Sequence, residues 1–169
     1  MRTSILAFIM FFIMTSASFA DSNVYITQSG AALDLDITMD GNGNAVGASN
    51  DRTLLTGANL DVDIDLIGAT NTITGDFIGA GESGSDDLKI SQTGSTNTTA
   101  LNVGASAATD DVKILETRVG SSGATTYTIG NAATVQDVSV TVDVVGDDID
   151  ITLVENSSST GSDLSLIHI

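Results

Sequence analysis

Acidic and amide side chains are the groups of this sequence that could bind a ligand. One set has the first, third, fifth and twelfth positions of a calcium-binding loop: Asp40, Asn42, Asn44 and Asp51. The sixth position of that loop is Ala45 instead of glycine, and the flanking segments are predicted to be strands, whereas such loops lie between helices. A Gly/Asn turn is therefore the preferred interpretation. A weak calcium site on these four residues is the alternative.

A second set of carboxylates recurs along the chain at intervals of 24 to 27 residues: Asp34, Asp61, Asp87 and Asp111. Each precedes the first apolar residue of a predicted strand, so stacked strands would place these carboxylates in one exposed column. A neighbouring column would hold Asp36, Asp63, Lys89 and Lys113. Like charges at this spacing repel, so counterions or the two lysines must offset the repulsion. A solvated acidic face is the preferred interpretation, and binding of Ca²⁺ along the aspartates is the alternative.

Residues for other chemistry are scarce. The chain has no cysteine and one histidine, His168, which argues against thiolate metal sites, disulfides and histidine-based catalysis. The acid pairs at 86–87 and 147–148 could suggest a glycosidase. Aromatic residues, which usually form sugar platforms, make up only 4% of the chain. We therefore expect no enzyme, no catalytic residue and no cofactor other than a weakly bound Ca²⁺.

The net charge limits the partners. It is −17, with five Lys and Arg residues against 22 Asp and Glu residues. No basic patch can form, so nucleic acid and anionic membranes are not expected as partners.

The elements that position these residues are predicted to be β-strands. Apolar residues alternate with polar ones at Leu33 to Met39, Leu60 to Leu66 and Val138 to Val144. Period two is typical of strands with one buried face. No segment after residue 20 has the apolar spacing of a helix, which predicts an all-β fold.

A longer pattern links the strands. With the first apolar residue numbered zero, Gly recurs at position six and Asn or an aliphatic residue at position nine, in units that begin at residues 35, 62, 88, 112 and 140. In the unit at 112, Glu116 and Arg118 interrupt the pattern. The repeat positions are Gln28, Gly30, Gly41, Asn44, Gly68, Asn71, Gln92, Gly94, Asn97 and Gly146. We expect the glycines to take positive φ at chain reversals, and each Asn to bond the same Asn of the next layer.

Such a repeat predicts a β-solenoid of about five strand-turn-strand rungs, since one unit cannot bury its own apolar face. A β-sandwich is the alternative. In the solenoid, five residues should point inward: Val24, Leu35, Val62, Leu88 and Val140. The aspartates at 34, 61 and 87 should point outward.

Part of the repeat resembles a known family. Gln28-Ser-Gly30, with Ser22 six residues earlier, and Gln92-Thr-Gly94-Ser-Thr-Asn97 are similar to the curlin repeat. That repeat runs Ser, five residues, Gln, one, Gly, two, Asn, one, Ala. The units at 41–44 and 68–71 keep its Gly and Asn. The resemblance implies a β-solenoid that is secreted through an outer membrane and stacks into an amyloid-like adhesive fibre.

The ends of the chain differ from its middle. Arg2 followed by an apolar run, with Ser18 and Ala20 at the −3 and −1 positions, predicts a signal peptide over residues 1–20. Residues 21–155 form the expected repeat domain. Residues 156–169 are interpreted as a polar linker and an incomplete or artefactual strand.

These features favour an exported structural or adhesive protein, including a curli-like fibre subunit of the kind found in biofilms. Its expected location is extracellular or on the cell surface, and its expected contacts are other subunits, a surface or a polysaccharide. A secreted acidic calcium-binding module is the alternative. A β-helix enzyme acting on polysaccharides ranks last.

Overall fold

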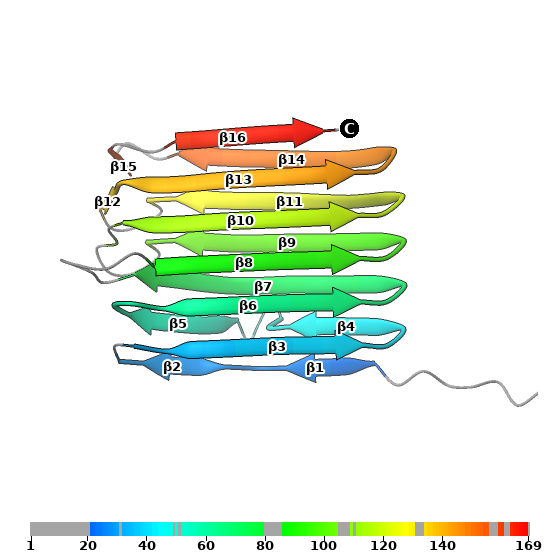
Figure 1. The fold of residues 1–169 in the computed structure, drawn as a ribbon, viewed down its shortest axis with the longest axis horizontal. Helices are drawn as coiled ribbons and strands as arrows, with labels where there is room; N and C mark the ends of the chain where they lie inside the picture. The colour runs from blue at the N-terminus through cyan, green and yellow to red at the C-terminus, as the bar shows by residue number, and fades with distance from the viewer. Residues whose placement is uncertain are drawn as a thin grey trace, which may run out of the picture.

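The computed structural model describes residues 21–30, 32–48, 50, 52–79, 86–104, 109, 111–130, 134–155, 159–160 and 163–168. Its regular structure is β throughout this part of the chain, in two large sheets and a small third one (Figure 1). Within these ranges, no helix is long and apolar enough to cross a membrane.

The six-stranded sheet stacks one strand from each circuit of the chain. Its strands, from the N-terminal end, are β3 (Asp34–Asp40), β6 (Asp61–Ile67), β8 (Asp86–Thr93), β10 (Val112–Val119), β13 (Val138–Val145) and β16 (Asp163–His168).

The eight-stranded sheet lies opposite, and its first two layers are interrupted strands. It contains β1 (Ser22–Val24), β2 (Thr27–Ser29), β4 (Gly43–Val46), β5 (Thr53–Gly57), β7 (Thr70–Gly79), β9 (Thr96–Val103), β11 (Ser122–Ile129) and β14 (Asp148–Glu155). The short strands β12 (Val135–Gln136) and β15 (Ser159–Thr160) pair with each other.

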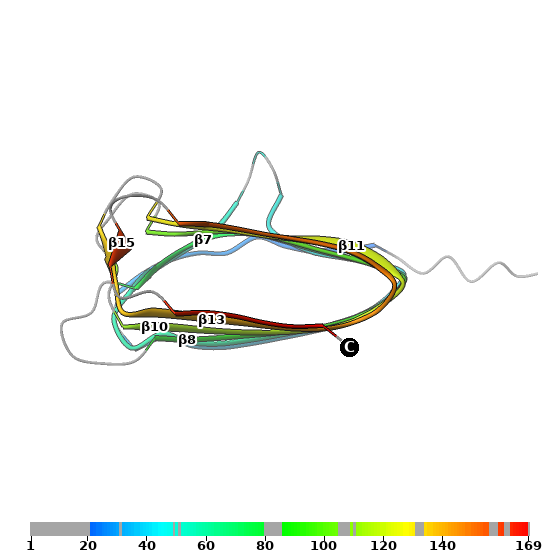
Figure 2. The same cartoon turned by 90° about the horizontal axis from the view of Figure 1, so that it is seen from above.

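The chain forms a β-solenoid. It alternates between the two sheets and returns one layer higher after each circuit, which we call a rung (Figures 1 and 2). All pairs between named strands are parallel, as β3 with β6 and β9 with β11 illustrate. The predicted solenoid is therefore confirmed. The alternative, a β-sandwich, is wrong because its sheets would be built from antiparallel neighbours.

The two sheets enclose a narrow aliphatic core. Val62, Leu88 and Val140 are buried, and Val24 and Leu35 pack against the core from the first layers. Asp34, Asp61 and Asp87 face outward on the same strands. The predicted inward and outward sets are thus confirmed.

The register of the fourth unit differs from the prediction. Leu88 pairs with Ile114, so this unit begins at 114 instead of 112. The strands then repeat at intervals of 27, 26, 26 and 26 residues from Leu35 to Val140. As a result, Lys113 lies beside Asp87, and Asp111 precedes β10 outside the column. The error arose because Val112 is also apolar and inward, one inward position before the true start.

Glycine at the turns has a different cause from the one predicted. Of the repeat glycines, Gly30 has the predicted positive φ, whereas Gly41, Gly68, Gly94 and Gly146 do not. A Cβ on Gly68 would lie 2.0 Å from the carbonyl oxygen of Gly41, and one on Gly94 would lie 1.9 Å from that of Gly68. Close stacking of one turn on the next therefore requires glycine there.

Gln28 and Gly30 do not belong to the column of Gln92 and Gly94. Gln28 pairs with Leu55 in the eight-stranded sheet, whereas Gln92 pairs with Leu66 in the six-stranded sheet. The two Gln-x-Gly segments therefore lie on different sheets. Sequence could not separate them because inward residues alternate identically in both sheets.

The C-terminal segment, interpreted above as an incomplete or artefactual strand, includes β16. β16 pairs with β13 over six residues, from Ser139 opposite Asp163 to Val144 opposite His168. It thus adds a layer to the six-stranded sheet. The predicted signal peptide at 1–20 lies outside the described residues.

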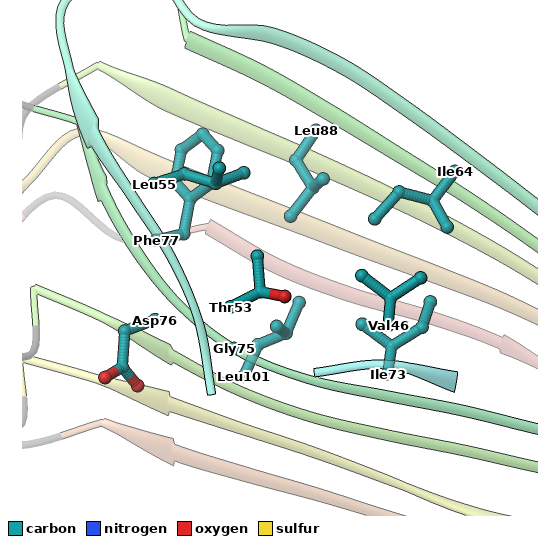
Figure 3. A pocket seen from close by; sticks show the side chains of 10 residues that line it. All are labelled: Val46, Thr53, Leu55, Ile64, Ile73, Gly75, Asp76, Phe77, Leu88 and Leu101. Carbon is teal, nitrogen blue, oxygen red and sulfur yellow. The ribbon is translucent and has the colours of Figure 1, made fainter. Parts of the chain in front are cut away.

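A cavity of about 20 Å³ lies in the core beside the gap between β4 and β5 (Figure 3). Its lining is mostly aliphatic and includes Phe77 and Thr53. This volume is close to that of one water molecule. The cavity is therefore too small for a substrate.

Candidate functional site

An amide ladder runs up the inside of the solenoid next to the turns. Asn44 donates to Oδ1 of Asn71 at 3.0 Å, and Asn71 donates to Oδ1 of Asn97 at 2.9 Å. Each side-chain amide also donates to a carbonyl of the turn above, as Asn97 does to Val119 at 3.1 Å. The predicted Asn-to-Asn contact between layers is confirmed. The ladder starts at Asn44, whose Oδ1 is buried without a partner among the described residues.

A cluster of buried polar side chains crosses the core above this ladder. Its members come from both sheets and replace the aliphatic residues found at the same positions in other rungs: Gln92, Thr99, Glu116, Arg118, Thr125 and Tyr127. We call this set the polar core cluster. Each side chain in it is at most 1% exposed.

Glu116 is the acceptor at the centre of the cluster. Its Oε1 accepts from Thr99 at 2.7 Å and from Thr125 at 3.1 Å, and its Oε2 accepts from the Tyr127 hydroxyl at 2.8 Å. Thr99 and Tyr127 come from the sheet opposite Glu116. The carboxylate therefore links the two sheets across the core.

Arg118 supplies the opposite charge and continues the ladder. Its Nε lies 3.9 Å from Oε1 of Glu116, Nη1 donates to Thr125, and Nη2 donates to the carbonyl oxygen of Asn97 at 2.5 Å. The position of the next ladder residue is taken by Gly123, where a Cβ would lie 2.0 Å from Nη2. The missing side chain at Gly123 thus leaves the space that the guanidinium fills.

Burial dominates the electrostatics of the cluster. Desolvation raises the pKa of Glu116, while hydrogen bonds from Thr99 and Tyr127 and the charge of Arg118 oppose that rise. Desolvation also raises the pKa of Tyr127 well above its usual range, so the phenol keeps its proton and donates to Glu116. A charged pair with this many partners is a stable arrangement only while both members are present.

The exposed acidic columns form as predicted in their first three layers. Asp34, Asp61 and Asp87 are register partners on β3, β6 and β8. In the next column, Lys89 follows Asp36 and Asp63, and its Nζ lies 3.4 Å from Oδ1 of Asp63 and 3.7 Å from that of Asp61. These carboxylates raise the pKa of Lys89, Asp63 most strongly.

The structure describes three of the four residues of the predicted calcium loop. Asp40 and Asn42 are exposed, but Asn44 points into the core and its amide belongs to the ladder. Asp51 lies outside the described residues. Among the His, Cys, Asp and Glu residues that the structure does describe, no group of three or more is placed to hold a metal ion.

The two ends of the six-stranded sheet offer backbone groups for further pairing. Asp61 N–H donates to Leu33 O, and Gly41 N–H donates to Ile67 O. Successive residues of a strand point their N–H and C=O groups to opposite sides, so the backbone groups of the odd-numbered residues of β3 point toward β6. The N–H and C=O groups of Asp34, Asp36, Thr38 and Asp40 therefore point away from the stack, at its N-terminal edge. Among the described strands, β16 lies at the opposite edge.

No family model, curated protein or solved structure matches this chain.

Sequence reasoning missed the polar core cluster because Glu116 and Arg118 were interpreted as interruptions. The signal that could have placed them is Gly120. Counting back six residues from that glycine gives Ile114 as the start of the unit, which puts Glu116 and Arg118 at inward positions. Two opposite charges at inward positions of one strand indicate a buried pair.

Proposed function

We propose that this protein is an exported structural or adhesive β-solenoid whose copies join end to end into a fibre. The observation that supports this best is that, among the described residues, β3 and β16 end a six-stranded sheet whose strands repeat every 26 or 27 residues from β3 to β13. A second copy can extend such a stack with the same parallel register as the layers within one chain. The resemblance to the curlin repeat favours the same function.

Charge makes such joining dependent on salt. If β16 of one copy pairs with β3 of the next as it pairs with β13, Asp163 takes the register position beside Asp34. Their proximity, added to a net charge of −17, opposes association at low ionic strength. We expect residues 21–169 to be monomeric in dilute buffer and to form filaments in high salt or millimolar Ca²⁺.

The experiment blocks one edge without disturbing the fold. The N–H group of Thr38 points out of the stack, so Thr38→Pro removes an edge donor and no internal hydrogen bond. Thr38→Ala keeps that donor and is the matched control. Filaments are followed by thioflavin fluorescence and electron microscopy, and folding by circular dichroism.

We expect filaments from the unmodified chain and from Thr38→Ala, and a folded monomer from Thr38→Pro. An unmodified chain that stays monomeric for weeks at high concentration in seawater-like salt would exclude the fibre. Filaments of equal yield from Thr38→Pro would show that this edge is not used.

A calcium-binding module is the second candidate, supported by the column of Asp34, Asp61 and Asp87. If the column binds Ca²⁺, millimolar Ca²⁺ raises the melting temperature more than NaCl of equal ionic strength. Asp61→Asn should remove that difference, whereas Asp147→Asn, an exposed change outside the column, should not. Equal effects of the two salts on the unmodified chain would mean screening alone.

A further inference from the structure

Three side chains of the polar core cluster have the roles needed for an acyl transfer. Thr99 offers a hydroxyl nucleophile, Gln92 offers a carboxamide carbon, and Glu116 offers a carboxylate that can take a proton. They come from β9, β8 and β10, so the fold brings all three strands to one point. Neither the amide ladder nor the proposed edge pairing uses this combination.

The distances place the hydroxyl between base and electrophile. Oγ1 of Thr99 lies 2.7 Å from Oε1 of Glu116 and 3.2 Å from Oε1 of Gln92. One C=O bond of about 1.23 Å separates that amide oxygen from its carbon, so the carbon lies within about 4.5 Å of Oγ1. A rotation of the Gln92 amide is enough to present its carbon to the hydroxyl, which is already hydrogen-bonded to its base.

The surroundings favour reaction and protect its product. Gln92 and Thr99 are each 1% exposed, and Glu116 is 0% exposed, so water is excluded. Burial raises the pKa of Glu116, which makes it a better base than an exposed carboxylate. Arg118 is the register partner of Gln92 on β10, and its Nε is buried without a hydrogen bond among the described residues. Its positive charge lies above the amide whose oxygen becomes negative during attack.

We propose that Thr99 and Gln92 form an intramolecular ester with Glu116 as the general base. Glu116 takes the hydroxyl proton while the bond from Oγ1 of Thr99 to Cδ of Gln92 forms. The bond from Cδ to Nε2 then breaks, the proton passes from Glu116 to that nitrogen, and one ammonia leaves. No oxidant, metal or cofactor is required. The ester ties β8 to β9 across the core, beside the turn at Gly94, and its formation does not depend on fibre assembly.

Mass spectrometry tests the ester directly. Residues 21–169 are purified under denaturing conditions, refolded, and measured intact after renewed denaturation. We expect the mass to match the sequence before folding and to fall by one ammonia after it. In the tryptic peptide of residues 90–113, backbone fragments between positions 92 and 99 should be missing, because the ester closes that loop.

Variants separate this reaction from other losses of ammonia. The sequence Asn42-Gly43 can also lose ammonia by succinimide formation, but that change maps to a different tryptic peptide. Thr99→Val and Glu116→Gln should keep the full mass after refolding, whereas Thr99→Ser, which keeps a hydroxyl, should lose ammonia. Thr98→Val, at the outward-facing neighbour on β9, is the matched control and should also lose ammonia.

Circular dichroism confirms that each variant is folded before its mass is interpreted. Because the central comparison is the unmodified chain before and after folding, the test holds even if a core variant does not fold. A refolded, unmodified chain with its full sequence mass would overturn the proposal. A loss of ammonia that persists in folded Thr99→Val would overturn it as well.

Discussion

Arg118→Met is expected to be among the most destabilising single substitutions in this protein, although methionine fits the column. The neighbours of Arg118 on β8 and β13 are Gln92 and Val144, so an apolar side chain has room there. The substitution leaves Glu116 buried without its counterion. Breaking a buried pair by removing one partner costs about 3–5 kcal/mol.

Replacing both charges should cost less than replacing one. Glu116 lies between the aliphatic residues Ile90 and Val142, so isoleucine fits its position. Glu116→Ile alone should also lower the free energy of unfolding by about 3–5 kcal/mol, because Arg118 then remains buried without its counterion. The double variant leaves no charge in the core. In the double variant the buried Tyr127 hydroxyl loses its acceptor, which should lower the free energy of unfolding by about 1–3 kcal/mol. The two substitutions are therefore expected to be strongly non-additive.

Urea unfolding followed by circular dichroism, in low salt where the chain is expected to be monomeric, measures the three free energies. Lys113→Met is the matched control on the same strand. Its side chain is exposed, so it should change stability by no more than about 0.5 kcal/mol. If Arg118→Met cost no more than this control, or if the double variant equalled the sum of the singles, the buried pair would not be coupled as described.

The other predictions concern the same interior. Ser22 is the register partner of Asn44 below the ladder, so Ser22→Asn should give the unpaired Oδ1 of Asn44 a donor and raise the free energy of unfolding by about 1 kcal/mol; an unchanged urea midpoint would contradict this. Gly94→Ala should lower the melting temperature strongly, because its Cβ would overlap the carbonyl of Gly68, and an unchanged melting temperature would contradict this. Because the pKa of Glu116 is raised on folding, the stability linked to its proton is fully present below its unfolded value of 4.5 and is lost as the pH rises through the folded pKa. Urea unfolding against pH should show this decline in the unmodified chain and a flatter profile in Glu116→Gln, and equal profiles would refute the assignment.

The two sheets and the amide ladder could be predicted from sequence because each follows from local spacing. Alternation at Val138 to Val144 requires one buried face, and Asn at position nine recurs at the same height in Asn44, Asn71 and Asn97. These features involve one type of residue at one position. In a stack of equal rungs, each rung therefore forms the same strands and the same Asn contact, and the repeat spacing is enough to predict them.

The polar core cluster and the turn glycines could not be predicted in this way. Glu116 is tolerated in the core because Tyr127 and two threonines of the other sheet donate hydrogen bonds to its carboxylate. These partners do not recur at a fixed distance from Glu116 in the repeat, so the repeat pattern does not reveal them. Gly68 and Gly94 are required by the carbonyl of the preceding turn, a constraint that does not depend on their own φ angle. Both features depend on which rung lies above which.

Pairing between successive layers also sets how the protein responds to force. The backbone pairing of each inner strand of the six-stranded sheet is with the strands one circuit before and after it, as β8 pairs with β6 and β10. Pulling on the two ends therefore peels strands away one layer at a time, and each 26-residue layer releases roughly 90 Å of extended chain. The layers of β8 to β11 are tied across the core by Glu116, so rupture there should need the largest force. A stack of this construction yields in steps and absorbs work at each one.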